Sequence, residues 1–425
     1  MLTEADQITK SEPWRSLRPD ARPIAVRVRP AAEHALRQGH PWVFDHSIEQ
    51  QSRAGAAGDL AVVFDRKRKH FLAIGLWDPA SPIRMRVLQH HTPVPIDGGW
   101  WRQRAETAMR LRAQLPASGT TGYRLVHGEN DGLPGLVLDR YGSTLVMKLY
   151  TAALAPHLTT ILDTVVDLAA PWPIERILVR LSRAVQAQAA TLAGLANGQV
   201  VWGHPLVEEV RFLENGLQFV ADPVRGQKTG FFLDQRDNRA RVELLADGQD
   251  VLNVFAYSGG FSVYAARGGA RSVLSLDSSR PALAAAERNF ALNQGHPRVA
   301  QARHDIVAAD AFQALAELRR QRREFGLVIV DPPALAKEQS QVAGALAAYG
   351  RLTALALRVL APGGILVMAS CSSRVTAAHF FAAVHQAASE VGRPLRELER
   401  TGHPADHPIG FAEGAYLKCL FARAP

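Results

Sequence analysis

Short apolar runs alternate with helical stretches from about residue 251 onward. The apolar runs cover 251–255, 272–277, 326–331 and 364–369. The helical stretches cover 261–267, 281–293 and 343–360. Apolar strands that alternate with helices are typical of a parallel sheet covered on both faces. We therefore predict an α/β domain in the last part of the chain.

The first part of the chain has a different pattern, with short runs of β type separated by turn-forming residues. These predicted strands cover 24–28, 60–64, 71–76 and 83–88, and Gly58-Asp59 and Asp78-Pro79 lie between them. Several short strands within so few residues favour a small β-barrel. The segment before them shows no periodicity and ends in Arg22-Pro23, so we expect a loose leader there.

The region between these two parts mixes predicted helices with predicted strands. It contains a helix over 100–115, a glycine-rich turn over 128–135 and a strand over 145–150. A hairpin is predicted around 207–220, where Glu214-Asn215-Gly216 is a turn signal. The predicted organisation is thus a leader (1–23), a barrel (24–92), a middle α+β domain (93–205) and an α/β domain (206–425).

Composition narrows the class of protein. With 47% hydrophobic and 21% charged residues, the chain of 425 residues can bury a proper core. The formal net charge of +9 favours an anionic partner, with nucleic acid first and an anionic membrane surface second. A charge surplus is also compatible with a soluble enzyme that binds no polyanion.

The chain has two cysteines, Cys371 and Cys419, which excludes a disulfide framework and a cysteine-based zinc finger. We therefore expect a reducing, cytoplasmic setting and no metal. An uninterrupted apolar run of about 18 residues does not occur, so no membrane-spanning helix is expected.

Candidate ligand-binding residues lie where the predicted parallel strands end, which is where open α/β sheets bind ligands. After the first strand comes a glycine turn, whose candidate residues are Asn253, Phe255, Ser258, Gly259 and Gly260. Asp277 closes the next strand, 17 positions after Gly260, where its carboxylate can accept both hydroxyls of a ribose. Asp310 can hold an adenine amino group beside Phe312, although aspartate at such a junction is commonly a helix N-cap. Asp331 ends a fourth strand.

The glycine turn does not have the GxGxxG pattern of a dinucleotide site or the GxxxxGK[ST] pattern of a P-loop. The ordered set of the turn, Asp277, Asp310 and Asp331-Pro332-Pro333 is more informative. This arrangement resembles a class I S-adenosylmethionine-dependent methyltransferase with a Rossmann-like sheet.

Further segments make the resemblance more specific. These are Gly39 to Phe44, Gly128 to Gly135, Gln227 to Arg239, Gly363 to Ser372 and Asp406 to Pro408. Together they resemble the bacterial 23S rRNA cytosine-carbon-5 methyltransferase family that carries an N-terminal PUA domain. The resemblance implies a PUA-like barrel, S-adenosylmethionine as cofactor, 23S rRNA as partner, and no membrane. A homodimer is possible.

The resemblance also implies roles for individual residues. Carbon 5 of cytosine is too weakly nucleophilic to take a methyl group unaided, but a thiolate that adds at carbon 6 activates it. We assign Cys371 as this nucleophile, with Asp331 hydrogen-bonded to ring nitrogen 3. Phe231, Gln235 and Arg236 are implied in cofactor binding, and Arg236 or Arg239 can pair with the methionine carboxylate.

Several alternatives stay open. Ala334 follows the two prolines where many RNA cytosine methyltransferases have a second cysteine, and the base that removes the carbon 5 proton is unidentified. A cysteine on an apolar strand is often only a small buried hydrophobe, in which case the enzyme would methylate guanine or another nucleotide. A non-catalytic RNA-binding assembly factor is a further possibility.

One basic run suggests a contact surface for RNA. Its residues are Arg66, Lys67, Arg68 and Lys69, followed by His70. Such a run can be a solvated hairpin tip, but on a barrel attached to an RNA-modifying domain we favour contact with phosphates.

Overall fold

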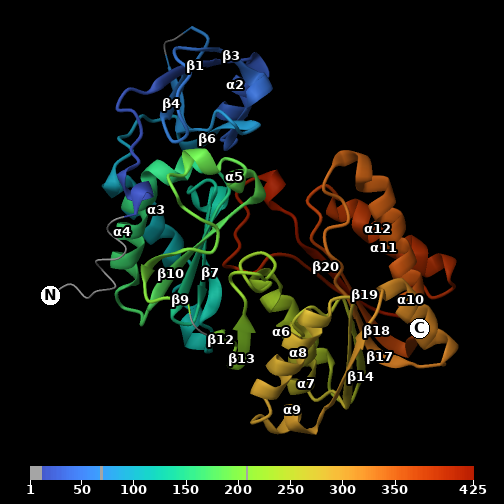
Figure 1. Cartoon of the computed structure of the whole chain (residues 1–425). Coiled ribbons are helices and arrows are strands. Elements are labelled where there is room, and N and C mark those ends of the chain that lie inside the picture. The colour runs from blue at the N-terminus through green and yellow to red at the C-terminus, as the bar shows by residue number, and fades with distance from the viewer. Residues whose placement is uncertain (1–11, 68–69, 207–208) are drawn as a thin grey trace. The chain divides into compact units, whose positions relative to one another are not determined.

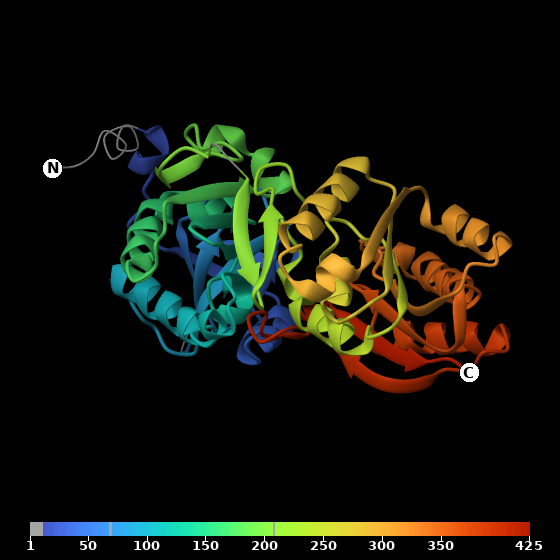
Figure 2. The same cartoon turned by 90° about the horizontal axis from the view of Figure 1, so that it is seen from below.

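The computed structural model describes residues 12–67, 70–206 and 209–425 (Figures 1 and 2). It divides into two compact units. The first contains the chain up to Gly216, with Ala221–Phe231 and Ala405–Phe411. The second contains Leu217–Val220, Phe232–Pro404 and Ala412–Pro425.

The first unit begins with a six-stranded sheet of order β2-β6-β5-β4-β1-β3. Its strands are β1 (Ile24–Val28), β2 (Trp42–Phe44), β3 (Ile48–Gln51), β4 (Leu60–Phe64), β5 (Phe71–Trp77) and β6 (Ile83–His90). Helix α2 (Pro30–Arg37) follows β1. Alternate residues of β1 face the core, as its pattern predicts, and Ile24, Val26 and Val28 are buried. The four strands predicted in this region are confirmed.

A second sheet follows in the same unit, with order β11-β10-β9-β8-β7. Its strands are β7 (Gly122–His127), β8 (Leu136–Tyr141), β9 (Thr144–Leu149), β10 (Arg176–Leu181) and β11 (Val200–Gly203). Helices α3 (Gly98–Arg110), α4 (Leu158–Ala169) and α5 (Arg183–Gln186) lie in this region. The predicted hairpin is formed by β12 (Val210–Glu214) and β13 (Leu217–Ala221), with positive φ at Asn215 and Gly216.

The larger hydrophobic core of this unit is distinct from a smaller one formed by the first sheet, which contains Ile24, Val43 and Trp77. The larger core joins Leu76 and Leu88 of the first sheet to residues of α3 and the second sheet. Trp14 belongs to the same core with 1% of its surface exposed, within a short 3-10 helix over Pro13–Ser16. The structure thus differs from the expected loose leader over these residues, because a buried indole contributes apolar area to the core.

The second unit is built on a seven-stranded sheet of order β16-β15-β14-β17-β18-β20-β19. The strands are β14 (Asp250–Val254), β15 (Ser272–Asp277), β16 (Arg303–Ala308), β17 (Phe325–Val330), β18 (Leu360–Ser370), β19 (Arg396–Thr401) and β20 (Lys418–Arg423). The first five in this order are parallel, and β20 is antiparallel to both of its neighbours. The predicted α/β domain is confirmed.

Helices cover both faces of this sheet (Figure 1). One group is α6 (Arg236–Leu245), α7 (Gly260–Arg267), α8 (Arg280–Leu292) and α9 (Pro297–Gln301). The other group is α10 (Ala311–Arg320), α11 (Val342–Leu357) and α12 (Ala377–Glu390). No helix within the described residues is long and apolar enough to cross a membrane.

The order of the strands identifies where a ligand can bind. From β14 the chain proceeds to β15 and β16 on one side, and then to β17 and β18 on the other. A crevice forms at the carboxyl ends of the strands where the direction of winding reverses. The loop after β14 and Asp331, which directly follows β17, lie at this point.

Candidate functional site

The loop after β14 has an unusual backbone. Phe255, Tyr257 and Gly259 have φ values of 61°, 48° and 75°. Positive φ is unfavourable for residues with a Cβ, and such conformations gather at functional sites. At Gly259 an added Cβ would lie 2.7 Å from the Cβ of Ala286, so glycine is required there on both counts.

Asp277 holds this loop in place. One carboxylate oxygen accepts the backbone N–H of Tyr257 at 2.9 Å, and the other accepts that of Ser279 at 2.8 Å. Asp277 ends β15 and is half-buried. Because each oxygen has two lone pairs, the carboxylate can accept further hydrogen bonds from a ligand.

Asn253 lies at the buried end of β14. Its Nδ2 donates to Ser262 Oγ at 2.9 Å, while its Oδ1 is buried and has no hydrogen-bond partner among the described residues. The carbonyl of Ser258 accepts a bond from Asn289 Nδ2 at 2.8 Å. Gly260 begins α7. The predicted turn residues are therefore gathered around one strand end.

Asp310 is an exposed N-cap of α10. Its Oδ1 accepts the backbone N–H groups of Phe312 and Gln313 at 3.0 and 3.1 Å. Asp310 is therefore the N-cap of α10, and it accepts both of these hydrogen bonds with one of its two carboxylate oxygens. Capping the helix and binding a ligand are therefore compatible roles for this carboxylate.

Asp331 is oriented by a series of buried amides. Gln235 Nε2 donates to Asp331 Oδ2 at 3.0 Å, and Gln235 Oε1 accepts from Asn238 Nδ2 at 2.5 Å. Asn238 Oδ1 in turn accepts from Thr401 Oγ1 at 2.5 Å. Gln235 and Asn238 are nearly fully buried, at 2% and 1% exposure. Asn238 lies in the segment 227–239 that carries the family resemblance. Thr401 has no local signal, since β19 brings it here from far along the chain.

Cys371 directly follows β18 and is half-buried. Its Sγ lies 3.9 Å from the carbonyl oxygen of Pro332, the residue after Asp331. The ends of the neighbouring strands β17 and β18 therefore bring a thiol and a carboxylate into the same part of the site. By contrast, Cys419 is fully buried on β20, and burial raises the pKa of its thiol well above the usual value.

The backbone around Cys371 is fixed by hydroxyl groups. Tyr349 Oη lies 2.8 Å from Ser370 Oγ and 3.2 Å from Ser372 Oγ. Ser372 Oγ also accepts the backbone N–H of Leu335 at 3.0 Å. These bonds connect the segment of Cys371 to α11 and to the loop after Asp331, so the position of the thiol is well defined.

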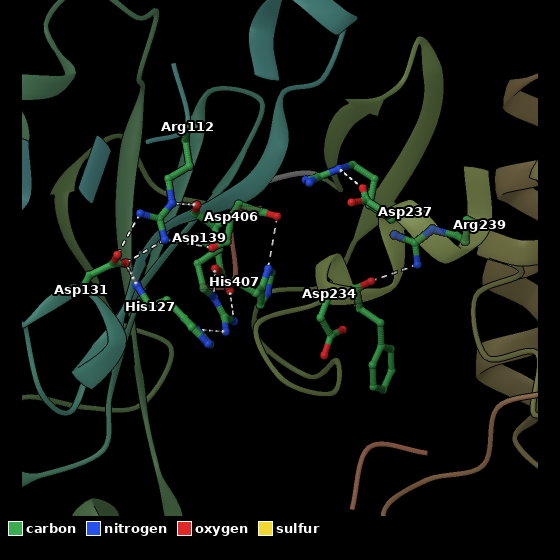
Figure 3. A network of polar contacts seen from close by, with 12 residues as sticks. Arg112, His127, Asp131, Asp139, Asp234, Asp237, Arg239, Asp406 and His407 are labelled. Carbon is green, nitrogen blue, oxygen red and sulfur yellow. Dashed lines mark hydrogen bonds and ion pairs between the residues drawn. The ribbon is translucent and has the colours of Figure 1, made fainter. Parts of the chain in front are cut away.

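The other residues implied in cofactor binding have clear structural partners. Arg236 is buried at the start of α6, with Nε 3.2 Å from Asp237 Oδ1. Arg239 Nη1 donates to the carbonyl oxygen of Phe232 at 2.9 Å (Figure 3). Phe231 belongs to the first unit, where its buried ring contacts Phe212 with centroids 5.1 Å apart.

The motif over 128–135 is part of a buried polar network in the first unit (Figure 3). Arg112 makes two hydrogen bonds with Asp131, at 2.9 and 2.7 Å, and also donates to the carbonyl oxygen of Asp406. Asp406 Oδ2 accepts the backbone N–H of Arg124, whose guanidinium pairs with Asp139 at 2.7 and 2.9 Å. These contacts give the motif a structural role.

The basic run lies on the first sheet. Arg66 and Lys67 are exposed, and Arg68 and Lys69 lie outside the described residues. Arg66 Nη1 is 3.3 Å from Glu49 Oε1. A groove of about 420 Å³ adjoins this position, with the exposed ring of Phe64 and the side chain of Arg27 in its lining.

Comparison with protein families and solved structures agrees with this geometry. Residues 182–423 match the model of the S-adenosylmethionine-dependent methyltransferase family, and residues 26–90 match that of the PUA-like domain. The solved structure "Crystal structure of SMU.776, a putative methyltransferase complexed with SAH" is similar over 94% of this chain and 99% of its own, with a TM-score of 0.79 and 20% identity. The class is thereby defined: this is an S-adenosylmethionine-dependent methyltransferase with a PUA-like domain.

Two curated relatives refine the assignment. "Ribosomal RNA large subunit methyltransferase" of Deinococcus radiodurans is 50% identical over 94% of this chain and 97% of its own length. "Ribosomal RNA large subunit methyltransferase I" of Shewanella amazonensis is 36% identical over 94% of this chain and 99% of its own. The chain belongs to this PUA-containing family of S-adenosylmethionine-dependent ribosomal RNA large subunit methyltransferases.

Proposed function

We propose that this enzyme methylates carbon 5 of a cytosine in 23S rRNA through a temporary covalent bond to Cys371. The observation that carries the proposal is the half-buried Cys371 thiol at the end of β18, beside the segment of Asp331 and Pro332. A fully buried structural cysteine such as Cys419 has no comparable access to a ligand.

The reaction follows from the chemistry of the ring. The Cys371 thiolate adds to carbon 6 of cytosine, which makes carbon 5 nucleophilic. Bound S-adenosylmethionine supplies an electrophilic methyl group. Once carbon 5 carries the methyl, a base removes its proton. The electron pair of that C–H bond re-forms the double bond between carbons 5 and 6, and Cys371 leaves as a thiolate. We propose that the carboxyl group of Asp331, which accepts a hydrogen bond from Gln235, shares a proton with ring nitrogen 3 and stabilises charge on the ring.

The residues at the strand ends fit the cofactor in their chemistry. Asp277, Asp310 and Asp331 are hydrogen-bond acceptors, and Asn253 Oδ1 is a buried acceptor without a partner among the described residues. The hydroxyl and amino groups of S-adenosylmethionine are donors that such acceptors can bind. We propose that these residues hold the cofactor, together with Gln235, Arg236, Phe255, Ser258, Gly259 and Gly260. Phe231, which belongs to the first unit, stays a prediction from the family resemblance.

The target must be accessible to the site. A base in an RNA helix has to be flipped out, and a loop or unpaired target lowers this cost. The names of the relatives support large-subunit rRNA as the substrate. Phosphate contacts by Arg66 and Lys67, beside the groove that Phe64 lines, are proposed to help hold it.

The covalent step can be tested directly with RNA that contains 5-fluorocytosine. The fluorine at carbon 5 cannot leave as a proton does, so the adduct with the enzyme accumulates and survives denaturing electrophoresis. We expect adduct formation with wild type and with Cys419→Ala, and none with Cys371→Ala. Full methylation by Cys371→Ala would overturn the mechanism and would favour guanine or another nucleotide as the target.

The substrate requires a test in cells. Bisulfite sequencing of 23S rRNA from a strain that lacks the gene is expected to show the loss of one protected cytosine relative to the parent strain. An unchanged map would contradict the proposed site of methylation. If the protein also failed to bind S-adenosylmethionine in calorimetry, a role as an RNA-binding assembly factor would replace the enzymatic one.

A further inference from the structure

A buried lysine on β20 lies next to the segment of Cys371. Lys418 is 4% exposed, and the register of β18 with β20 pairs it with Ser370. Its Nζ donates to the carbonyl oxygen of Ser372 at 2.6 Å and to that of Tyr416 at 2.9 Å. Lys418 therefore contacts both neighbours of Cys371 in the chain. Its backbone pairs with Ser370, and its amine donates to the carbonyl oxygen of Ser372.

The hydrogen-bond partners of the Lys418 amine do not neutralise its positive charge. Both of its hydrogen-bond partners are neutral carbonyl groups. A buried ammonium group is costly unless a negative charge compensates for it. Burial lowers the pKa of Lys418 to about 8, and the charge of Cys371 acts against this shift. The interaction is reciprocal, so a positive charge on Lys418 favours the thiolate of Cys371.

Other groups near Cys371 act differently. When ionised, the carboxyl group of Asp331 after β17 contributes a negative charge, which disfavours a thiolate nearby. Tyr349 on α11 has a raised pKa, first because of burial, with the charges of Cys371 and Asp331 adding to the effect. It is therefore neutral near pH 7. Among Asp331, Tyr349 and Lys418, Lys418 alone can carry a positive charge that favours the thiolate of Cys371.

We propose that Lys418 is a positioning residue for the nucleophile: its ammonium group maintains Cys371 as a reactive thiolate and fixes the backbone that carries it. The inference rests on the proposed function, in which this thiolate adds to carbon 6 of the base. It explains how Cys371 can be a thiolate at neutral pH, where a free cysteine is mostly protonated.

The test measures the reactivity of Cys371 without RNA or turnover. In a Cys419→Ala background, Cys371 is the single thiol, and its alkylation by iodoacetamide is followed against pH. Lys418→Gln keeps an N–H donor for the carbonyl groups and removes the charge, whereas Lys418→Arg keeps the charge. We expect alkylation at pH 7 to fall about 10-fold in Lys418→Gln and less than 3-fold in Lys418→Arg, since one pKa unit is a tenfold change.

An unchanged pH profile in Lys418→Gln would overturn the inference. Lys337→Gln, at an exposed lysine, is the matched control and is expected to leave the profile unchanged. Calorimetric binding of S-adenosylmethionine reports whether each variant is folded. If Lys418→Gln does not fold, the alkylation profile of the Cys419→Ala protein is the test by itself. A thiol pKa near the ordinary value of 8.5 for Cys371 would contradict the inference.

This test separates the inference from the proposed function. Alkylation reports the thiol pKa whether or not Cys371 attacks cytosine, while the 5-fluorocytosine adduct reports the attack itself. An adduct with an unchanged profile in Lys418→Gln rejects only the role of Lys418. A shifted profile without an adduct rejects the covalent mechanism.

Discussion

Gln235 and Asp331 are joined by a hydrogen bond of 3.0 Å, in which the buried amide donates to the carboxylate. The amide is itself held by Asn238. Both the oxygen and the nitrogen of the Gln235 amide are hydrogen-bonded, so the amide cannot rotate freely. Its N–H donor therefore keeps one orientation toward Asp331. Asp331 is thus presented to the site by α6 and the segment before it.

Removal of this donor should affect the chemical step. Gln235→Leu is expected to lower kcat roughly 10-fold, since a hydrogen bond to a charged group contributes about 1.5–3 kcal/mol. Steady-state methylation of a 23S rRNA fragment measures the effect. Gln301→Leu, at an exposed glutamine, is the control. Equal kcat values for the two variants would show that Gln235 does not support catalysis.

Asp277 is expected to contribute to cofactor affinity. Asp277→Ala removes a proposed acceptor for the ribose and also the partner of the Tyr257 N–H. The Kd for S-adenosylmethionine in calorimetry should rise roughly 10- to 100-fold. Asp305→Ala on the exposed strand β16 should leave it unchanged. An unaltered Kd in Asp277→Ala would remove this residue from the proposed site.

The salt dependence of RNA binding tests the basic run. The double variant Arg66→Ala, Lys67→Ala should weaken binding and reduce the slope of log Kd against log salt by roughly 1–2, as expected for two lost phosphate contacts. A matched pair, Arg319→Ala with Arg320→Ala, removes the same number of exposed charges from α10. A similar loss of slope in both pairs would indicate nonspecific electrostatics only.

The buried network of the first unit should matter for stability. Arg124→Met leaves the fully buried carboxylate of Asp139 without its guanidinium partner. Breaking such a pair costs about 3–5 kcal/mol of the free energy of unfolding. Denaturant titration measures it. Arg303→Met disrupts an exposed ion pair with Asp305 and should change the midpoint little.

His304 predicts a dependence of stability on pH. Its ring stacks on Phe290 and contacts Ser275 Oγ, and burial lowers its pKa to about 4. Between about pH 6.5 and 4 the unfolded chain takes up a proton that the folded protein does not, so stability falls as pH decreases through this range. The loss is at most about 3 kcal/mol.

Denaturant titrations between pH 4 and 7 check this prediction. His304→Gln should flatten that part of the stability profile, whereas His379→Gln, at an exposed histidine, should not. Identical profiles for the wild type and His304→Gln would contradict the assignment.

Local patterns were sufficient to predict β1, β4, β5 and β6 of the first sheet and the central strands β14, β15, β17 and β18 of the second unit. The predicted range 272–277 coincides with β15, and 24–28 coincides with β1. The helix predicted over 100–115 ends earlier, at Arg110, because Arg112 turns inward to pair with Asp131. Such an end depends on a partner distant in the sequence, which a local pattern does not contain.

The candidate site was predictable where it follows from strand order. Asp277 and Asp331 end parallel strands, and the loop after β14 has the glycines that its backbone requires. The support for Asp331 through Asn238 and Thr401 was not predictable, since it depends on which strand forms the edge next to β20. Lys418 does have a signal in the sequence, because it begins β20 between the apolar residues Leu417 and Cys419.

The first unit includes Ala405–Phe411, which the chain supplies only after most of the second unit has been made. Within this segment Asp406 accepts hydrogen bonds from Arg112 and Arg124. A protein cut after residue 205 would lack these acceptors and leave two buried arginines short of partners. Synthesis on the ribosome must therefore reach residues 405–411 before the buried polar network of the N-terminal half is complete.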